Sequence, residues 1–517
     1  MSKMLKKGCA LALATAMTAG LLAGCGSDKG NAEKNTVTEG KDYKGLDISQ
    51  HVDLKMYLLG APTDDFDEVY AEVNKILEDK LNCSLSVDFL SWGEHDTKYS
   101  LLFSSQEDFD LIFTASPWAH YEQTVALGGF YPMSEEFVHK NAPDVWDVVP
   151  EIAWDQAKIS GTAYMVPNNR MEFGQDVYAV RGDLMEKYGI ESISSWDDLY
   201  NFAMACAKDG IFVGNGAPWY QYFQDKGMSL LNGIPNELVL YNTQDPEDLD
   251  YKYILDWDEF KEYCNEAKEM AAAGCWSRDV LNSTEERQVP FLSGRSAGLF
   301  WNTGACRNFA REGNKSNPDW KATIQDPCKS QPKKVNPYTN NGIAINNGSK
   351  NPERAMMVIN ELYTNQELQD LTCLGIEGKH WEAVGDKEFK IIDESGYGVD
   401  SNCNWGWKND EIGRTEFVEN KTEVDETYAA MVEDFEQNAK EVHPYDGFSF
   451  DATNVTTQVA AVQGVVDTYQ APLINGLVDD VDTAIEELRS SLDSAGMQDI
   501  LDELDRQLKE YIASKSE

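Results

Sequence analysis

Residues 52–90 read VDLKMYLLGAPTDDFDEVYAEVNKILEDKLNCSLSVDFL and switch between the hydrophobic periods of strand and helix. Residues 52–59 alternate and then become fully apolar, which is typical of a strand that enters a core. Apolar side chains between Phe66 and Leu81 recur every three or four residues and predict a helix with one buried face. Residues 83–90 alternate again and predict a second strand.

The pattern continues with a helix to about Gln106 and a third strand over 109–114. This strand–helix order favours an α/β fold with a parallel sheet covered by helices. Ligands of such open sheets bind beyond the carboxyl ends of the strands. The loops at two of those ends contain Trp92, Ser116 and Trp118, so we expect these residues near a ligand.

The N-terminus has the features of a secretory signal peptide over residues 1–24. Three lysines precede an apolar stretch that is too short to span a membrane comfortably, and the exit reads Leu-Ala-Gly-Cys. This exit resembles a bacterial lipoprotein box, which implies a lipid (diacylglycerol, palmitate) on Cys25. We therefore expect an extracytoplasmic protein that the lipid alone holds at the outer face of the cell membrane. Residues 25–48 are poor in apolar side chains and predict a flexible tether.

Composition excludes several classes of protein. The chain carries 89 acidic and 44 basic side chains, a net charge of −45, which disfavours nucleic acid and anionic lipid as partners. None of the eight cysteines after Cys25 has C-x-x-C spacing, so no zinc or redox motif is predicted, while free thiols and disulfides both stay open. About 470 residues follow the tether, enough for more than one core, so we expect two lobes.

In order along the chain, these segments resemble the extracellular solute-binding proteins of ABC importers, in the sugar-binding group that includes maltose-binding protein. The matching motifs lie at 127–133, 178–184, 195–199 and 291–298. The resemblance implies a two-lobe periplasmic-binding-protein-like fold (type II), each lobe a mainly parallel sheet flanked by helices. Lobe 1 would comprise 49–162 and 338–400, lobe 2 would comprise 163–337 and 401–517, and the hinge would lie near 161–167 and 335–343. The tail from Gly447 resembles LipO-like lipoproteins, which carry a C-terminal domain of unknown function.

The resemblance implies a monomeric binding protein, not an enzyme, that needs no metal or cofactor and delivers an extracellular oligosaccharide to permease subunits. Sugars present apolar C–H faces and polar rims, so their sites combine aromatic platforms with fixed polar groups. The loop after the third strand lacks the Asp-Arg pair of maltose-binding protein, which argues against maltose itself. The candidate contacts besides Trp92, Ser116 and Trp118 are Asn169, Trp219, Tyr220, Trp301, Asn302, Trp405, Trp407 and Phe448.

Two alternatives remain from the residues. A peptide or amino acid would need charged partners for its termini, which Arg170 and Arg181 could supply. A surface glycoside hydrolase would need two flanking carboxylates, but no motif marks such a pair. Residues 294–298 fit the G-x-S-x-G pattern of a nucleophile elbow, yet helix-forming residues precede Ser296 and strand-type residues follow it, the reverse of the required order. We expect a structural turn there.

Overall fold

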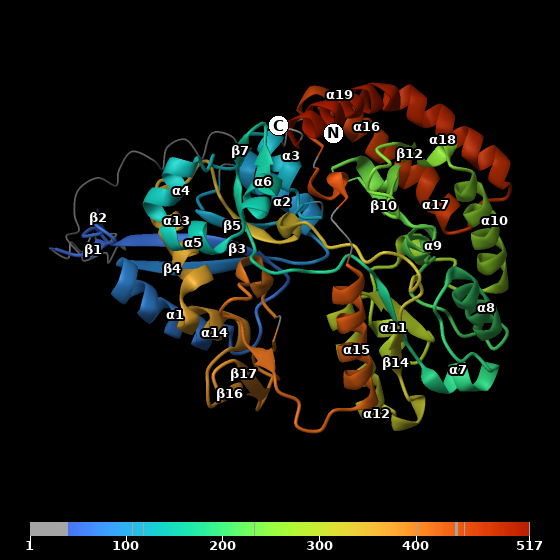
Figure 1. Cartoon of the computed structure of the whole chain (residues 1–517), viewed down its shortest axis with the longest axis horizontal. Coiled ribbons are helices and arrows are strands. Elements are labelled where there is room, and N and C mark those ends of the chain that lie inside the picture. The colour runs from blue at the N-terminus through green and yellow to red at the C-terminus, as the bar shows by residue number, and fades with distance from the viewer. Residues whose placement is uncertain are drawn as a thin grey trace, which may run out of the picture.

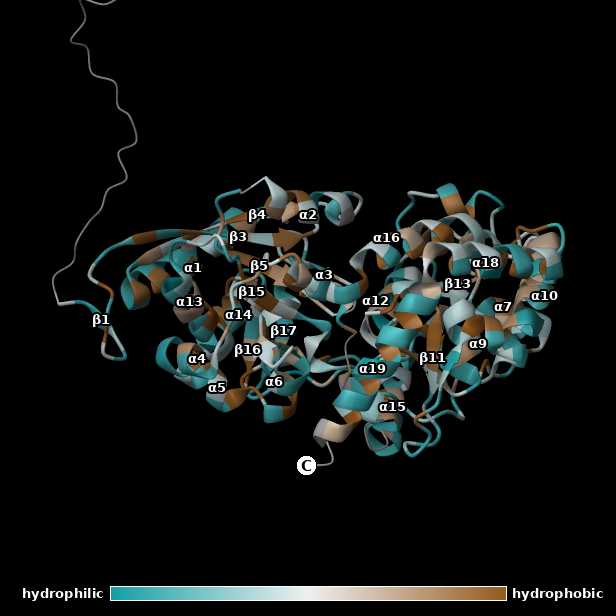
Figure 2. Cartoon of the chain, turned by 90° about the horizontal axis from the view of Figure 1, so that it is seen from above, coloured by the Kyte–Doolittle hydropathy of each residue, from teal (hydrophilic) through white to brown (hydrophobic). Residues whose placement is uncertain are grey.

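A computed structural model describes residues 40–515 except 106, 117, 232, 400, 440–442 and 449. The expected signal peptide and Cys25 lie outside the described residues. Figure 1 shows two lobes, with the C-terminal helices along the top of the second. In Figure 2 the apolar residues lie mainly within each lobe, and hydrophilic residues dominate the outer helices. Among the described residues, no helix has the length and apolarity needed to cross a membrane.

The first lobe is built on a five-stranded sheet with the order β4-β3-β5-β15-β8. The predicted strands β3 (Val52–Leu59), β4 (Cys83–Leu90) and β5 (Leu111–Thr114) are present and run parallel. β15 (Gly342–Ile345) is antiparallel to both β5 and β8 (Met165–Pro167). The carboxyl ends of β3, β4 and β5 therefore share one edge of this sheet.

Helices lie on both sides of this sheet (Figure 1). In α1 (Phe66–Leu81) the buried residues are the predicted ones at three- and four-residue spacing, and Asn82 ends the helix in the left-handed conformation at φ 49°. The other first-lobe helices are α2 (His95–Ser104), α3 (Tyr121–Ala126), α4 (Glu135–Asn141), α5 (Pro143–Val148), α6 (Glu151–Ala157), α13 (Pro352–Thr364) and α14 (Gln366–Leu374). Short strands at its periphery are β6 (Lys158–Ile159), β7 (Thr162–Ala163), β16 (Trp381–Val384), β17 (Glu388–Ile391) and β18 (Thr415–Glu416).

The second lobe differs from the parallel sheet that we expected there. Its β9 (Val177–Val180) lies between β13 (Gly298–Trp301) and β14 (Thr323–Gln325) and is antiparallel to both. The reason is the connection: β13 and β14 are joined through α12 (Thr303–Ser316), which leaves them parallel to each other with the opposed β9 between them. Around them lie α7 (Gly182–Tyr188), α8 (Trp196–Ala207), α9 (Trp219–Asp225), α10 (Asp258–Ala273), α11 (Val289–Leu292) and α15 (Glu423–Asn438).

The C-terminal region packs on the second lobe as a group of helices. α16 (Thr456–Val465), α17 (Ala471–Ile474), α18 (Val481–Ala495) and α19 (Met497–Lys515) share one hydrophobic core with α8 and α10. They also cover a three-stranded antiparallel sheet of β10 (Met228–Leu230), β11 (Val239–Asn242) and β12 (Tyr251–Tyr253).

Three expected boundaries need correction. Residues 42–48, expected in the tether, include the hairpin of β1 (Asp42–Tyr43) and β2 (Leu46–Asp47), because Tyr43 and Ile48 bury their side chains in the first core. The chain leaves the first lobe after β8 rather than at residue 162. Cys403 and Trp407 also belong to the first core, so the return to the second lobe comes after them and not at residue 401.

All eight described cysteines are free thiols, and all but Cys373 are buried. Burial raises the pKa of the Cys83 and Cys206 thiols to about 12. At pH 8 a thiol with that pKa is ionised in about one molecule in 10⁴ and hardly reacts. We expect Ellman's reagent to label at most Cys373 in native protein spanning residues 40–515, and all eight cysteines after unfolding. Fewer than eight thiols after unfolding without reductant would show a disulfide and contradict this structure.

Candidate functional site

Three of the predicted aromatic residues come together at the carboxyl edge of the first-lobe sheet. Trp92 lies between Trp118 and Trp405, with ring centroids 6.2 Å and 6.4 Å away, and its ring is nearly parallel to that of Trp405. Trp92 is 50% exposed and Trp118 is 36% exposed, whereas Trp405 is half-buried. We call these three residues the tryptophan face. It presents large apolar rings to solvent at the edge where ligands of such sheets bind.

The local structure holds these rings in place. Trp92 packs over Gly60, which follows β3 with φ 100°, and a Cβ there would lie 3.0 Å from the indole nitrogen of Trp92. The Trp118 indole N–H donates a hydrogen bond to the carbonyl of Asn340 at 2.9 Å. Phe113 of β5 lies under both Trp118 and Trp405, at centroid distances of 5.4 Å and 6.2 Å. The tryptophan face is therefore preorganised by a close backbone approach, a hydrogen bond and core packing.

The segments that connect the lobes run beside this face. Residues 168–175 and 334–341 are joined by hydrogen bonds from the backbone N–H of Asn168 to Asn341 and from that of Asn336 to Glu172. Asn340, whose carbonyl accepts from Trp118, donates its amide N–H to the Glu172 carboxylate at 3.0 Å. The predicted contact Asn169 donates its side-chain N–H to Asn409 at 2.9 Å, and Asn409 in turn donates to the carbonyl of Tyr363 in α13, so Asn169 is tied to the first lobe.

The second lobe places Trp301 at the end of β13, paired with Val177 at the start of β9. The Arg287 guanidinium lies 4.6 Å from the centre of the half-buried Trp301 ring, a cation–π geometry, and Phe309 stacks on it at 5.9 Å. Asn302 uses its side-chain oxygen to accept from the N–H of Ala305 and caps α12. Asn302 therefore serves as the N-cap of α12, a position that Asn commonly occupies.

Tyr220 lies close to the carboxylates of Glu237 and Asp176, which were not among the contacts predicted from the sequence. It is 40% exposed, and its hydroxyl donates to Glu237. Desolvation raises the pKa of both the Glu237 and the Asp176 carboxyl, while the Arg287 guanidinium acts against this shift at Asp176. Glu237 also has a left-handed backbone at φ 60°, uncommon for a residue with a side chain. Among 89 acidic residues no sequence signal marks these two.

Four predicted contacts are corrected by their burial. Trp219 and Phe448 are 2% and 4% exposed and pack in the second core. Trp407 is fully buried and donates its indole N–H to Thr372 at 2.9 Å. Ser116 is buried, and its hydroxyl donates to Glu122. These side chains are enclosed by packing that a sequence pattern does not reveal, so they do not enter the candidate site.

The Ser296 turn has the predicted order of elements. α11 precedes it and β13 follows it, and the buried hydroxyl donates to the carbonyl of Gly298 at 2.8 Å. A nucleophile elbow would place a strand before the serine and expose its hydroxyl. Ser296 is therefore a turn residue. No group of three potential metal ligands occurs within the part of the chain that the structure describes.

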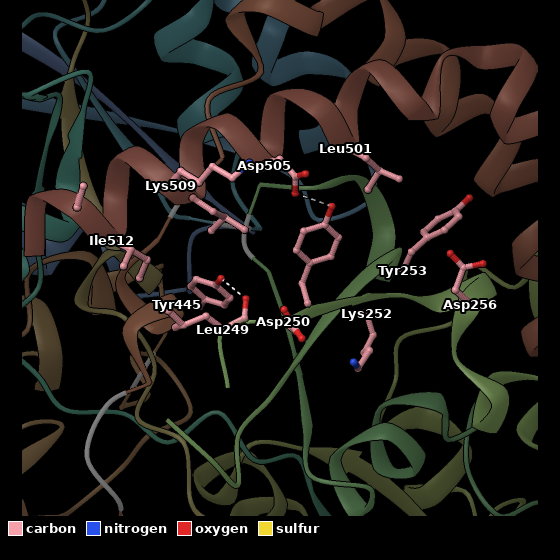
Figure 3. Close-up of a pocket in the computed structure, with 13 residues that line it drawn as sticks. Leu249, Asp250, Lys252, Tyr253, Asp256, Tyr445, Leu501, Asp505, Lys509 and Ile512 are labelled. Carbon is pink, nitrogen blue, oxygen red and sulfur yellow. Dashed lines mark hydrogen bonds between the residues drawn. The ribbon is translucent and has the colours of Figure 1, made fainter. Parts of the chain in front are cut away.

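A cavity of about 910 Å³ lies elsewhere, between the β12 region and α19 (Figure 3). Two hydrogen bonds join residues of its wall: Tyr251 donates to Asp505 at 2.9 Å, and Tyr445 donates to the carbonyl of Leu249 at 2.5 Å. None of the candidate contacts predicted from the sequence lines it, and it is distinct from the tryptophan face.

Two lobes, with an exposed aromatic face beside two of the segments that connect them, define a two-lobe ligand-binding protein. The chain belongs to the bacterial extracellular solute-binding protein family, which matches residues 63–369. Residues 444–513 match a domain of unknown function, as the resemblance of the tail predicted. Both matches confirm the predicted family and its two-lobe fold.

Similar proteins agree with this assignment. A carbohydrate ABC transporter substrate-binding protein of Streptococcus pneumoniae is 26% identical over 98% of each chain. The crystal structure of the N-glycan transport solute-binding protein NgtS of S. pneumoniae, in complex with Man1GlcNAc, has a TM-score of 0.69 at 23% identity and covers 89% of this chain and 100% of its own. An alginate-binding protein, with a TM-score of 0.66 at 14% identity over 89% of this chain and 98% of its own, shares the fold.

Proposed function

We propose that this protein captures an extracellular oligosaccharide and delivers it to the permease of an ABC importer. The observation that carries the proposal is the tryptophan face, because flat apolar rings at the ligand-binding edge of an open sheet suit the C–H faces of sugars. The carbohydrate and N-glycan transport functions of the similar pneumococcal proteins support the same ligand class.

The ligand is held between the tryptophan face and the group around Trp301 and Tyr220 in the second lobe. Both groups adjoin the connecting segment 168–175: Trp118 reaches it through Asn340 and Glu172, and Asp176 directly follows it. Asp176 lies four positions after Glu172, so the chain between them spans at most about 14 Å. Bending of the connecting segments would close the two groups around the ligand.

The remaining functional features follow the same proposal. Cys25 carries the lipid that tethers a monomeric binding protein to the outer face of the cell membrane. The protein binds the ligand and does not act on it as an enzyme. Residues up to about 41 then serve as the tether, because the first lobe begins with the β1–β2 hairpin.

The peptide alternative is less favoured because both candidate arginines are already engaged. Arg181 contacts Asp183 at 2.6 Å and stacks on Trp320 at 4.6 Å, and Arg170 lies 3.8 Å from Asp410. A peptide carboxylate would have to displace these partners.

A thermal-shift screen of the protein spanning residues 40–515 tests the proposal against its alternative. A ligand that binds only the folded state at 100 times its Kd stabilises it by about 2.7 kcal/mol and raises Tm by several degrees. We expect such a rise with neutral oligosaccharides and none with peptides of two to five residues. A rise with peptides alone would contradict the proposed function.

A further inference from the structure

We propose that Glu172 is a positioning residue that couples the bending of the connecting segments to the Trp118 ring of the tryptophan face. This inference rests on the proposed function and specifies how the affinity of that site is regulated. Glu172 lies on the first connecting segment, and its carboxylate is joined to the second segment, which holds Trp118. Glu172 therefore acts on a bound sugar through the Trp118 ring.

The main chains of the two connecting segments pair at two places. Near the first lobe the N–H of Asn168 donates to the carbonyl of Asn341 at 3.0 Å. Near the second lobe the N–H of Asn336 donates to the carbonyl of Glu172 at 2.7 Å. Residues 169–171 lie between these two pairs. Because hinge motions are absorbed by φ/ψ changes at a few such residues, we expect the lobes to bend relative to each other here.

The side chain of Glu172 spans this stretch. One carboxylate oxygen accepts hydrogen bonds from the side-chain amides of Asn340 and Asn341, at 3.0 Å and 3.2 Å. A carboxylate is a stronger acceptor than a neutral oxygen, so these contacts hold the second segment firmly. The carbonyl of Asn340 in turn accepts the indole N–H of Trp118 at 2.9 Å. Bending at 169–171 therefore moves Glu172 relative to the first lobe, and with it the group that fixes the Trp118 ring.

The other end of this stretch is anchored in the second lobe. The carbonyl of Gly174 accepts the side-chain amide N–H of Gln224 at 3.1 Å. Gln224 belongs to α9, the helix that also carries the exposed Tyr220. Glu172 therefore moves with the second lobe, and a contiguous chain of bonds connects α9 to Trp118.

Coupling between the lobe arrangement and the ring acts in both directions. If one arrangement holds the Trp118 ring where a sugar needs it, a sugar bound on that ring stabilises the same arrangement by the same factor. Such preorganisation raises affinity because less conformational freedom is lost on binding. If Glu172 only stabilised the fold, its loss would change stability and would leave the Trp118 ring and the affinity as they are.

The test follows Trp118 by ¹⁹F NMR in protein spanning residues 40–515 labelled with 5-fluorotryptophan. Among the 13 tryptophan resonances, the one that is lost in Trp118→Phe belongs to Trp118. Glu172→Ala is expected to shift this resonance in ligand-free protein and to weaken binding of a neutral oligosaccharide by about 10-fold, measured by calorimetry. Glu172→Gln should recover most of the affinity, because its amide oxygen accepts the same hydrogen bonds.

A double-mutant cycle decides whether Glu172 acts through Trp118. In Trp118→Phe the ring stays aromatic but has no N–H to donate to Asn340, so adding Glu172→Ala should cost little further affinity. The control is Glu266→Ala, because Glu266 accepts the indole N–H of Trp196 at 2.7 Å inside the second lobe. This control should shift the Trp196 resonance and leave the Trp118 resonance and the affinity unchanged.

Each other outcome has a defined meaning. An unchanged Trp118 resonance or affinity in Glu172→Ala, an equal loss of affinity in the control, or additive losses in the double variant overturns the inference and leaves the proposed function standing. If Glu172→Ala does not fold, Asn340→Ala decides, because it removes a donor to Glu172 and keeps the carbonyl that Trp118 contacts. An unchanged Trp118 resonance in that variant overturns the inference. Absence of binding by every neutral oligosaccharide removes the proposed function itself.

Discussion

Replacing Trp92 by alanine is expected to weaken oligosaccharide binding by about 30-fold without unfolding the protein. Trp92 is the middle and most exposed ring of the tryptophan face, so its loss removes the platform that a sugar ring covers. A tryptophan at the centre of a binding surface typically contributes about 2 kcal/mol or more, and about 1.4 kcal/mol corresponds to a factor of ten. Calorimetry with the neutral oligosaccharide checks the affinity.

The control for this variant is Phe417→Ala. Phe417 is a 38% exposed aromatic beside β18 at the periphery of the first lobe, and it takes no part in the tryptophan face. We expect the affinity of Phe417→Ala to equal that of the wild type. Equal losses in the two variants, or an unchanged affinity in Trp92→Ala, would remove Trp92 from the site.

Trp407→Ala is expected to destabilise the fold by about 3–5 kcal/mol, the usual cost of truncating a buried tryptophan. Trp407 is fully buried in the first core, and its indole N–H is hydrogen-bonded to Thr372. The truncation leaves a cavity and removes the donor to the Thr372 hydroxyl, which still donates to the carbonyl of Leu368. Thermal unfolding should show Tm lower by roughly 6–20 °C for a lobe of this size.

Trp405→Ala is the matched comparison, because Trp405 belongs to the same 3₁₀ turn, Asn404–Trp407, but lies half-buried in the tryptophan face. This variant should lose affinity for the oligosaccharide and keep most of its stability. The opposite pattern, with Trp405→Ala unstable and Trp407→Ala stable but unable to bind, would mean that the two side chains have been assigned the wrong roles.

The sequence predicted a residue's position correctly where that position depends only on the order and direction of the strands and helices. Trp92 and Trp118 follow parallel strands, so the strand–helix pattern predicts that their loops meet at one edge, and the structure brings the two rings together. The order of elements around Ser296 was equally readable, because a helix before the serine and a strand after it depend on local pattern.

The sequence did not show which of two neighbouring aromatic residues in a short segment is buried. Trp405 and Trp407 are two residues apart, and Trp219 and Tyr220 are adjacent, yet one of each pair is enclosed and the other is partly exposed. The difference arises from packing against distant elements, such as the core that surrounds Trp219. Tyr43 and Ile48 were missed for the same reason: a few apolar residues in a polar segment dock on a surface formed elsewhere.

The acidic part of the candidate site was beyond sequence reasoning altogether. Asp176 and Glu237 lie 61 positions apart in the numbering and come together with Tyr220 and Arg287 only through the tertiary fold. Their raised pKa values result from desolvation by that fold. In a chain with 89 acidic residues, no spacing distinguishes them.

The central claim is that an oligosaccharide binds at the tryptophan face, and a crystal structure of residues 40–515 with a bound neutral oligosaccharide tests it most directly. We predict a sugar ring against Trp92 and its neighbours Trp118 and Trp405, with the second-lobe group around Trp301 closing on the other side. A glycan seated instead in the cavity between β12 and α19 (Figure 3), with the tryptophan face empty, would contradict it.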